Sequence, residues 1–299
     1  MEEHKKNDLQ LWIDSCEADF EIRLNELATQ ALENKHVRLF RLSGPTCSGK
    51  TTLANLLKKR FLAKGKHLHL ISIDDFFYDK ALLHQRTGSE KTEELDYDSA
   101  ETIDWIELSR FLREIFSEQE SHCPIFSFRE GKRIGYRTVA SREEDVFLFE
   151  GIQAFYPEFT ELLDKVGYES VGLYIMPMRS LEVNGEVIKP NELRLLRRLV
   201  RDYNFRNSPP ENTLALWASV RRNEEANIFP YASAAEYWID STMEYELGVL
   251  KPYLDRILPT VSKEGPYWNT AETILRQMKD VCPIPSSMIS EGSLYQEFI

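Results

Sequence analysis

Gly44-Pro45-Thr46-Cys47-Ser48-Gly49-Lys50-Thr51 is the stretch that decides the fold. It fits the pattern G-x-x-x-x-G-K-[ST], which forms a phosphate-binding loop when a strand precedes it and a helix follows. Residues 37–42 are a short apolar run suited to a buried strand, and residues 52–62 place leucines along one helical face. Both flanking conditions hold, so the sequence predicts a nucleotide-binding site.

The residue types in this loop explain how it would hold a nucleotide. Two glycines let the backbone curl so that several N–H groups face inward, and the new helix adds its partial positive charge at the same point. In such a loop the lysine reaches the β- and γ-phosphates, while the threonine hydroxyl ligates Mg²⁺. We therefore expect the following residues to contact the nucleotide: Gly44, Cys47, Ser48, Gly49, Lys50, Thr51 and Thr52.

Length and composition limit the class of protein. A chain of 299 residues has room for one large α/β domain with terminal additions. The net charge of −12 argues against a general nucleic-acid binder, because phosphate backbones are gripped by basic surfaces. No run approaches the roughly eighteen apolar residues of a membrane span, and residues 1–6 lack the apolar core of a signal peptide. We expect a cytoplasmic protein without a membrane partner; a homo-oligomer is left open.

The four cysteines do not suggest a disulfide framework or a zinc site, because they lie far apart and form no C-x-x-C pair. His67 and His69 alternate along an expected strand at residues 66–73 but lack a third ligand nearby in the sequence. Because a metal site needs a fuller set of ligands, we interpret these two histidines as structural.

Acidic residues follow two of the expected strands. Asp74 and Asp75 come directly after the strand at residues 66–73, and Glu150 ends a buried apolar strand that begins at Val146. Ligands of open α/β sheets bind beyond the carboxyl ends of the strands. The aspartate pair is therefore well placed to meet a substrate hydroxyl, and Glu150 lies where a Mg²⁺ ligand belongs.

The rest of the chain divides around this central region. We expect an amphipathic N-terminal helix within residues 1–36, with its apolar face formed by Leu11, Ile22, Leu24, Leu27, Ala31 and Leu32. A nucleotide-binding domain is expected over residues 37–262, and a C-terminal helix and tail over residues 263–299, with the tail the least ordered part. Inside the domain, residues 79–101 resemble a surface loop, and residues 124–139 form a β-hairpin. Further strands are predicted at residues 171–176 and 235–239.

An arginine-rich helix provides the third informative stretch. Arg194, Arg197, Arg198 and Arg201 follow the spacing i, i+3, i+4, i+7 and so share one helical face. Guanidinium groups suit phosphate oxygens, which favours a lid that clamps the transferring group. The alternative is a solvated face paired with Glu192 and Asp202, because surface arginine pairing is common.

Together these motifs resemble the uridine kinase and phosphoribulokinase family of P-loop kinases, and within it a bacterial nucleoside-kinase branch. The resemblance rests on residues 44–52, 72–77, 95–100, 124–133, 149–152 and 194–206, with 217–230 and 293–299 pointing to the branch. It implies a three-layer α/β fold with a mostly parallel sheet, helices on both faces, a β-hairpin substrate wall and an arginine-bearing helical lid.

The resemblance also implies a role for each matching residue. Asp74 would accept the 5′-hydroxyl proton of a nucleoside, while Glu150 and Thr51, with Asp74, would hold Mg²⁺; ATP or another nucleoside triphosphate would be the donor. Neighbouring side chains on a strand point opposite ways, so Asp74 and Asp75 cannot both face the hydroxyl, and the resemblance alone selects Asp74. The implied catalytic residues are Asp74, Lys50, Arg197 and Arg201, and the implied substrate contacts are Asp96, Phe77, Phe126, Arg133, Arg194 and Arg206.

Two departures concern the acceptor. In uridine-cytidine kinases the matching hairpin carries a histidine that reads the pyrimidine, but here Gly131 stands at that position, and Phe126 replaces a usual tyrosine. Uridine or cytidine is the expected substrate, with another nucleoside or a small alcohol such as a sugar phosphate as the alternative. A non-catalytic nucleotide-binding regulator is the further alternative, although the N-K-x-D segment of GTPase switches does not occur.

Overall fold

A five-stranded sheet forms the centre of the protein. The computed structural model describes residues 2–33, 36–87, 99–117, 120–167, 169–183 and 185–299. The strands lie in the order β2-β5-β1-β6-β9, and each neighbouring pair runs parallel. Their bounds are β1 (Leu39–Ser43), β2 (Leu68–Ser72), β5 (Val146–Glu150), β6 (Ser170–Met176) and β9 (Tyr237–Asp240). This parallel sheet confirms the predicted α/β fold class.

The central strands are apolar along their whole length because both faces of the sheet are covered. In β5, Val146 and Leu148 belong to the core beneath the N-terminal helices, whereas Phe147 and Phe149 belong to the core on the opposite face. Alternate side chains of a strand point to opposite faces, so a strand buried on both sides needs apolar residues at each position.

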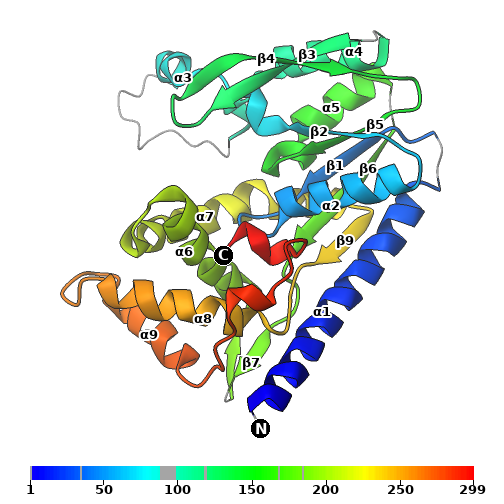
Figure 1. Ribbon diagram of the computed structural model, residues 1–299. Coiled ribbons are helices and arrows are strands. Elements are labelled where there is room, and N and C mark those ends of the chain that lie inside the picture. Colours follow the sequence, from blue (N-terminus) through cyan, green and yellow to red (C-terminus); the bar gives the residue numbers. More distant parts are fainter. Residues whose placement is uncertain (1, 34–35, 88–98, 118–119, 168, 184) are drawn as a thin grey trace.

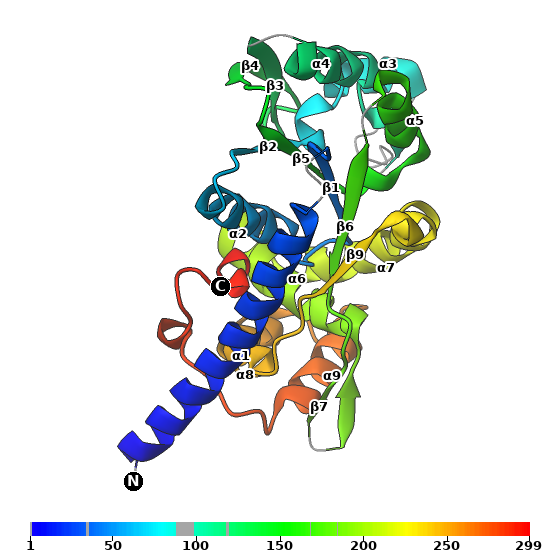
Figure 2. The ribbon, with the colours of Figure 1, turned by 90° about the vertical axis from the view of Figure 1, so that its right-hand side faces the viewer.

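Helices cover both faces of the sheet (Figures 1 and 2). On one face lie α1 (Glu2–Ala31) and α2 (Lys50–Ala63), whose buried residues share one core with the sheet. On the other lie α4 (Trp105–Ser117) and α5 (Pro157–Val166). The antiparallel hairpin of β3 (Glu120–Ser127) and β4 (Lys132–Ala140) packs with this second layer.

A helical region continues the molecule beyond the carboxyl ends of β6 and β9 (Figure 1). It contains α6 (Pro190–Arg206), α7 (Pro210–Asn227), α8 (Glu246–Ile257) and α9 (Trp268–Met278), which share a core of their own. The short hairpin of β7 (Leu181–Val183) and β8 (Glu186–Ile188) leads into α6 and was not predicted from the sequence.

Three local predictions were wrong. The core-facing stripe of α1 contains Ile13, Phe20, Leu24 and Leu27 rather than Leu11 and Ile22, which are 67% and 55% exposed. The expected surface loop after residue 79 begins with a helix, α3 (Lys80–Thr87). The C-terminal tail, expected to be the least ordered part, ends in residues whose side chains are fully buried: Leu294, Tyr295 and Phe298.

Among the described residues, the helices are all too short or too polar to span a lipid bilayer.

Candidate active site

The phosphate-binding loop lies between β1 and α2, and its geometry requires glycine at two positions. Gly49 has φ 97°, a left-handed conformation that favours glycine, and a side-chain carbon there would lie 2.8 Å from Leu294. At Gly44 such a carbon would lie 2.1 Å from the carbonyl oxygen of Ile175. A side chain at either position would therefore collide with a neighbouring residue, which explains the requirement for glycine at both.

Polar groups of the loop are arranged as an anion site would need. The ammonium group of Lys50 donates to the carbonyl oxygens of Gly44 and Pro45, at 2.7 and 3.0 Å, and so lies folded over the loop. The buried Ser48 hydroxyl has no hydrogen-bond partner within the described part of the chain. A buried polar group without a partner is costly, and a phosphate oxygen at the N-terminus of α2 would supply one.

Two arginines of α6 support this loop from inside the protein. Arg194 and Arg197 are 1% and 0% exposed, and their Nη1 atoms donate to the carbonyl oxygens of Thr46 and Cys47 at 3.2 and 3.3 Å. These bonds hold both carbonyls toward α6. The prediction that four arginines share one phosphate-facing surface is therefore wrong, because two of them are buried behind the loop.

Each buried arginine has its own glutamate. Glu224 binds Arg194 through two hydrogen bonds, and Glu246 accepts from Nε and Nη2 of Arg197 at 2.8 and 3.1 Å. Burial alone would lower the pKa of Arg197, but the carboxylate of Glu246 outweighs it and the pKa is raised. Such two-point pairing satisfies the planar guanidinium group and keeps it charged.

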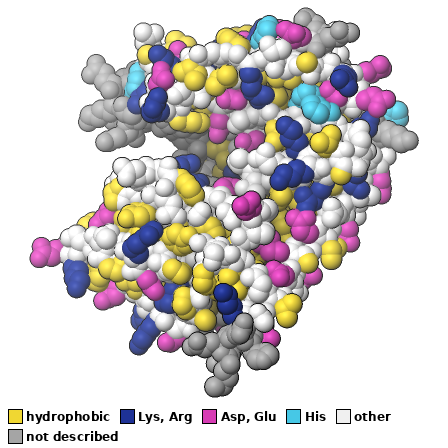
Figure 3. Space-filling model, viewed as in Figure 1, with side chains coloured by type: hydrophobic (Ala, Val, Ile, Leu, Met, Phe, Trp, Pro, Cys, Tyr) yellow, Lys and Arg dark blue, Asp and Glu magenta, His cyan; other side chains and the backbone are white. Residues whose placement is uncertain are grey.

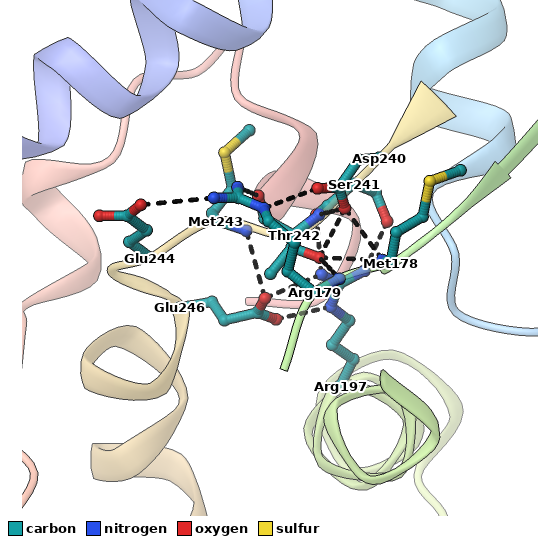
Figure 4. A network of polar contacts seen from close by, with 9 residues as sticks. All are labelled: Met178, Arg179, Arg197, Asp240, Ser241, Thr242, Met243, Glu244 and Glu246. Atoms are coloured by element: carbon teal, nitrogen blue, oxygen red, sulfur yellow. Dashed lines mark hydrogen bonds and ion pairs between the residues drawn. The ribbon is translucent and has the colours of Figure 1, made fainter. Parts of the chain in front are cut away.

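Figure 4 shows how this pairing is tied to the ends of the sheet. Nη2 of Arg197 also donates to the carbonyl oxygen of Ser241 at 2.9 Å. Arg179 lies in the same network, with its Nε donating to Asp240 at 2.7 Å and its Nη2 donating to the carbonyl of Thr242 at 3.0 Å. The network connects α6 to the segment that follows β9.

The remaining arginines of α6 gather around one carboxylate. Asp202 accepts hydrogen bonds from Arg198 at 3.2 Å and Arg201 at 2.7 Å, and Arg206 lies 3.6 Å away. Burial would raise the pKa of Asp202, but the arginines, Arg201 first, lower it below its ordinary value. Three cations around one carboxylate leave a surplus of positive charge. The other predicted partner, Glu192, instead accepts from the backbone N–H of Lys189 at 2.7 Å.

The aspartate pair lies in a 3₁₀ turn, Ile73–Phe76, at the carboxyl end of β2. The turn means that strand alternation does not decide which aspartate faces the substrate. Asp75 accepts from the backbone N–H of Phe126 at 3.2 Å and lies 4.0 Å from Arg137, so it holds the β3–β4 hairpin. Burial raises the pKa of Asp75. Asp75 is thus engaged with the hairpin.

Glu150 ends β5, which lies between β2 and β1 in the sheet. It accepts a hydrogen bond from the Ser72 hydroxyl at 3.4 Å. Burial raises the pKa of Glu150, the nearby Glu297 adds to this effect, and Lys50 opposes it. A carboxylate whose negative charge is so poorly compensated suits a divalent cation bound by oxygen ligands, so Glu150 and the Thr51 hydroxyl fit the expected Mg²⁺.

Aromatic rings connect the aspartate turn to the hairpin. The Phe77 ring centroid lies 5.5 Å from that of Phe126 and 5.8 Å from that of Phe128, whose residue is 63% exposed. Gly131 occupies the hairpin turn with φ 63°, and its carbonyl accepts from the backbone of Lys80 at 2.8 Å. The hairpin thus offers an apolar surface beside the aspartate turn, and Gly131 adds no side chain to it.

Arg133 and Asp96 complete the predicted substrate contacts. The Nη2 atom of Arg133 lies 3.4 Å from Asp104, and its Nη1 donates to the Tyr136 hydroxyl at 3.3 Å, so the guanidinium is held beside the hairpin. Asp96 lies outside the described residues.

Figure 3 shows a hollow between the part of the molecule that carries the hairpin and the helical part below it.

The C-terminal segment, residues 293–299, also packs against the loop, a contact that was not predicted from the sequence. Leu294 packs against Gly49, and the rings of Tyr295 and Phe298 lie 5.2 and 5.3 Å from the Arg197 guanidinium. The Glu297 carboxylate accepts two hydrogen bonds from Thr52, one from its hydroxyl at 3.0 Å and one from its backbone N–H at 3.4 Å. Thr52, expected to contact the nucleotide, thus donates to the tail. The apolar spacing of Leu294, Tyr295 and Phe298 was the available signal.

A parallel sheet with this loop after its first strand defines a P-loop protein. The model of the Phosphoribulokinase / Uridine kinase family matches residues 40–247, and the chain belongs to this family.

Two curated relatives and one solved structure show the extent of the similarity. The uridine kinase of Schizosaccharomyces pombe is 30% identical over 172 residues, which are 58% of this chain and 33% of that protein. Uridine-cytidine kinase B of Dictyostelium discoideum is 25% identical over 181 residues, 60% of this chain and 65% of that protein. The chain therefore spans about a third and just under two thirds of these relatives' lengths. A crystal structure from Silicibacter sp. TM1040, described as a candidate fructose transport system kinase, shares the fold with TM-score 0.50 and 22% identity, covering 72% of this chain and 98% of its own.

Proposed function

We propose that this protein transfers the γ-phosphoryl group of ATP, with Mg²⁺, to the 5′-hydroxyl group of a nucleoside, with uridine or cytidine the first candidates. One observation supports this most strongly: the aspartate turn after β2, Glu150 at the end of β5 and the phosphate-binding loop after β1 follow three adjacent parallel strands. The carboxyl ends of these strands meet at one edge, which is where ligands of open α/β sheets bind.

The loop would hold the donor. The Ser48 hydroxyl, which has no partner among the described residues, and the first residues of α2 would bind phosphate oxygens. Lys50 can exchange its two backbone carbonyl partners for the β- and γ-phosphates. Bound Mg²⁺ would neutralise charge that develops on the transferring group. Glu150 and Thr51 are the residues of this chain that would hold it.

Asp74 would orient the acceptor hydroxyl and take its proton. Phosphoryl transfer depends mainly on positioning and charge neutralisation, so an ordinary carboxylate in the right place is sufficient. Asp75 would act indirectly, since its hydrogen bond to Phe126 fixes the hairpin against the same turn.

The hairpin would recognise the base by stacking. Phe77, Phe126 and the exposed ring of Phe128 form an apolar surface, and base–aromatic stacking contributes about 1–3 kcal/mol per base with little dependence on its identity. Because Gly131 provides no side chain to read the pyrimidine, we expect weak discrimination between uridine and cytidine. Arg133 and Asp96 would complete the acceptor site.

Arg201 and Arg206 would contact phosphate groups. Their cluster carries more positive charge than Asp202 neutralises, which is what a polyphosphate would complement. Arg194 and Arg197 would instead position the loop through the carbonyls of Thr46 and Cys47.

A substrate panel tests the proposal. The purified chain is incubated with ATP and Mg²⁺ and, separately, each common nucleoside and several sugar phosphates, and ADP release is measured. We expect turnover of pyrimidine nucleosides. Turnover of a sugar phosphate without turnover of any nucleoside would replace this proposal with a phosphoribulokinase-like activity. Nucleotide binding without any acceptor would indicate a regulator.

A further inference from the structure

Two histidines and an aspartate meet at the end of the sheet opposite the candidate active site. His67 precedes β2, His69 lies within it, and Asp145 precedes β5. The amino ends of these two parallel strands lie side by side, since the N–H of Val146 donates to the carbonyl of His67 at 3.0 Å. Residues i and i+2 of a strand share a face, so both imidazole rings turn to the same side. The third ligand missing near them in the sequence is thus supplied by Asp145.

The three side chains converge on one point. Nδ1 of His67 lies 3.0 Å from Nε2 of His69, Nε2 of His69 lies 2.8 Å from Oδ2 of Asp145, and the third separation is 3.7 Å. With metal–ligand bonds of about 2.0–2.1 Å, neighbouring ligands of a tetrahedral zinc ion are about 3.3 Å apart. Two of the observed separations, 2.8 and 3.0 Å, are shorter than this value, and the third, 3.7 Å, is longer.

Hydrogen bonding alone does not explain this arrangement well. A ring nitrogen either carries a proton and donates or presents a lone pair and accepts. Nε2 of His69 faces both another ring nitrogen and a carboxylate oxygen. With a proton on Nε2, His69 would have to share that single proton between the Asp145 carboxylate and the His67 ring nitrogen; without it, Nε2 would present a lone pair to the carboxylate. A cation between the three atoms would receive a lone pair from each.

The site is held in place by its surroundings. The His69 ring stacks on Phe147 with centroids 4.9 Å apart. Oδ2 of Asp145 accepts from the N–H of Arg142 at 3.1 Å, and the Asp145 carbonyl accepts from Nε of Arg38 at 3.0 Å.

We propose that His67, His69 and Asp145 bind one zinc ion, or a similar divalent transition metal, that clips β2 to β5. Two imidazoles and a carboxylate suit zinc, whereas Mg²⁺ prefers oxygen ligands. The Mg²⁺ of the proposed kinase reaction belongs at Glu150, at the opposite end of β5, so the two sites are distinct in place and chemistry. Water would fill the remaining position, because the His67 side chain is 53% exposed.

Calorimetric titration of the chelator-treated full chain with zinc chloride tests this, with magnesium chloride titrated in parallel. We expect one zinc ion per chain, no magnesium binding in the absence of nucleotide, and a higher melting temperature with zinc. His67→Ala and Asp145→Asn should each weaken zinc binding about tenfold or more. His122→Ala, a histidine on the hairpin outside the cluster, is the matched control and should bind zinc like the unchanged chain.

His67→Ala is the most informative variant, because the ring is half exposed and its removal leaves the stacking of His69 intact. A melting curve without zinc establishes that each variant is folded. Cobalt substitution gives a second readout, since a tetrahedral site with nitrogen and oxygen ligands produces visible absorption without the charge-transfer band of a thiolate. Absence of zinc binding by the unchanged chain would overturn the proposal. Zinc binding equally tight in His67→Ala and Asp145→Asn, or a thiolate band, would overturn it as well.

Discussion

Glu297→Gln isolates the electrostatic effect of the tail on the candidate nucleotide site. The Glu297 carboxylate accepts from the Thr52 hydroxyl at 3.0 Å, in the first turn of α2, where the phosphates are expected. Its charge also contributes to raising the pKa of Glu150. Glutamine keeps an acceptor for Thr52 but removes the charge, so we expect the tail to stay in place and nucleotide to bind more tightly.

The size of the effect follows from Coulomb's law. Two unit charges about 6 Å apart repel by about 0.7 kcal/mol in water and about 3 kcal/mol at an effective dielectric constant of 20. Glu297 is partly exposed, which favours the lower part of this range. A change of about 1 kcal/mol corresponds to roughly fivefold tighter binding of ADP.

Calorimetric titration with ADP, with and without Mg²⁺, at low and high salt measures this change. The gain should shrink at high salt, because screening weakens repulsion between exposed charges. Glu291→Gln, an exposed acid in the same segment, is the control and should have little effect. Weaker binding of Mg·ADP by Glu297→Gln would overturn this prediction, since it would show that the Glu297 carboxylate contributes to nucleotide binding.

Three further changes follow from the same geometry. Gly49→Ala places a methyl group against Leu294 in a left-handed conformation, so we expect about 1–3 kcal/mol of destabilisation by thermal melting, partly reversed by adding Leu294→Ala. Burial raises the pKa of Glu150, so the charged carboxylate lowers the stability of the folded protein above its ordinary pKa of about 4.3. Glu150→Gln removes this charge, and at pH 7 the variant without ligand should therefore have a higher melting temperature. It should also lose binding of Mg·ATP. Asp202→Asn leaves three arginines without their shared carboxylate and should cost about 3–5 kcal/mol at pH 7 in denaturant unfolding. Because the pKa of Asp202 is lowered in the folded protein, its contribution is present above about pH 4, and the difference should shrink as the pH falls below that value. An unchanged melting temperature of Gly49→Ala or Glu150→Gln would contradict these expectations. So would a stability difference between Asp202→Asn and the unchanged chain that does not vary with pH.

Local patterns were sufficient for the sheet and the loop. The residues that form the phosphate-binding loop, Gly44–Thr51, are contiguous in the sequence, so the positions of the two glycines and the lysine are sufficient to predict the loop. The apolar run of β5 likewise reports burial on both faces. These features depend on residues close in sequence, and they were predicted correctly.

Features that depend on distant residues were not predicted. Arg194 and Arg197 looked like an exposed clamp because their glutamates lie 30 and 49 positions away. The third side chain beside His69 lies 76 positions along the chain, and the tail carboxylate that binds Thr52 lies 245 positions away. In each case tertiary packing brings together groups whose spacing in the sequence gives no sign of contact.

In the proposed reaction, Asp74 at the end of β2 accepts the proton of an alcohol whose oxygen attacks a nucleotide held by the loop. Asp74→Asn removes this base, and ADP binding by calorimetry and nucleoside phosphorylation by ADP release are measured on the same preparation. The proposal predicts that phosphoryl transfer falls by at least about a hundredfold, as expected for loss of a general base, while ADP binding changes little. Unchanged turnover would contradict the assignment of Asp74.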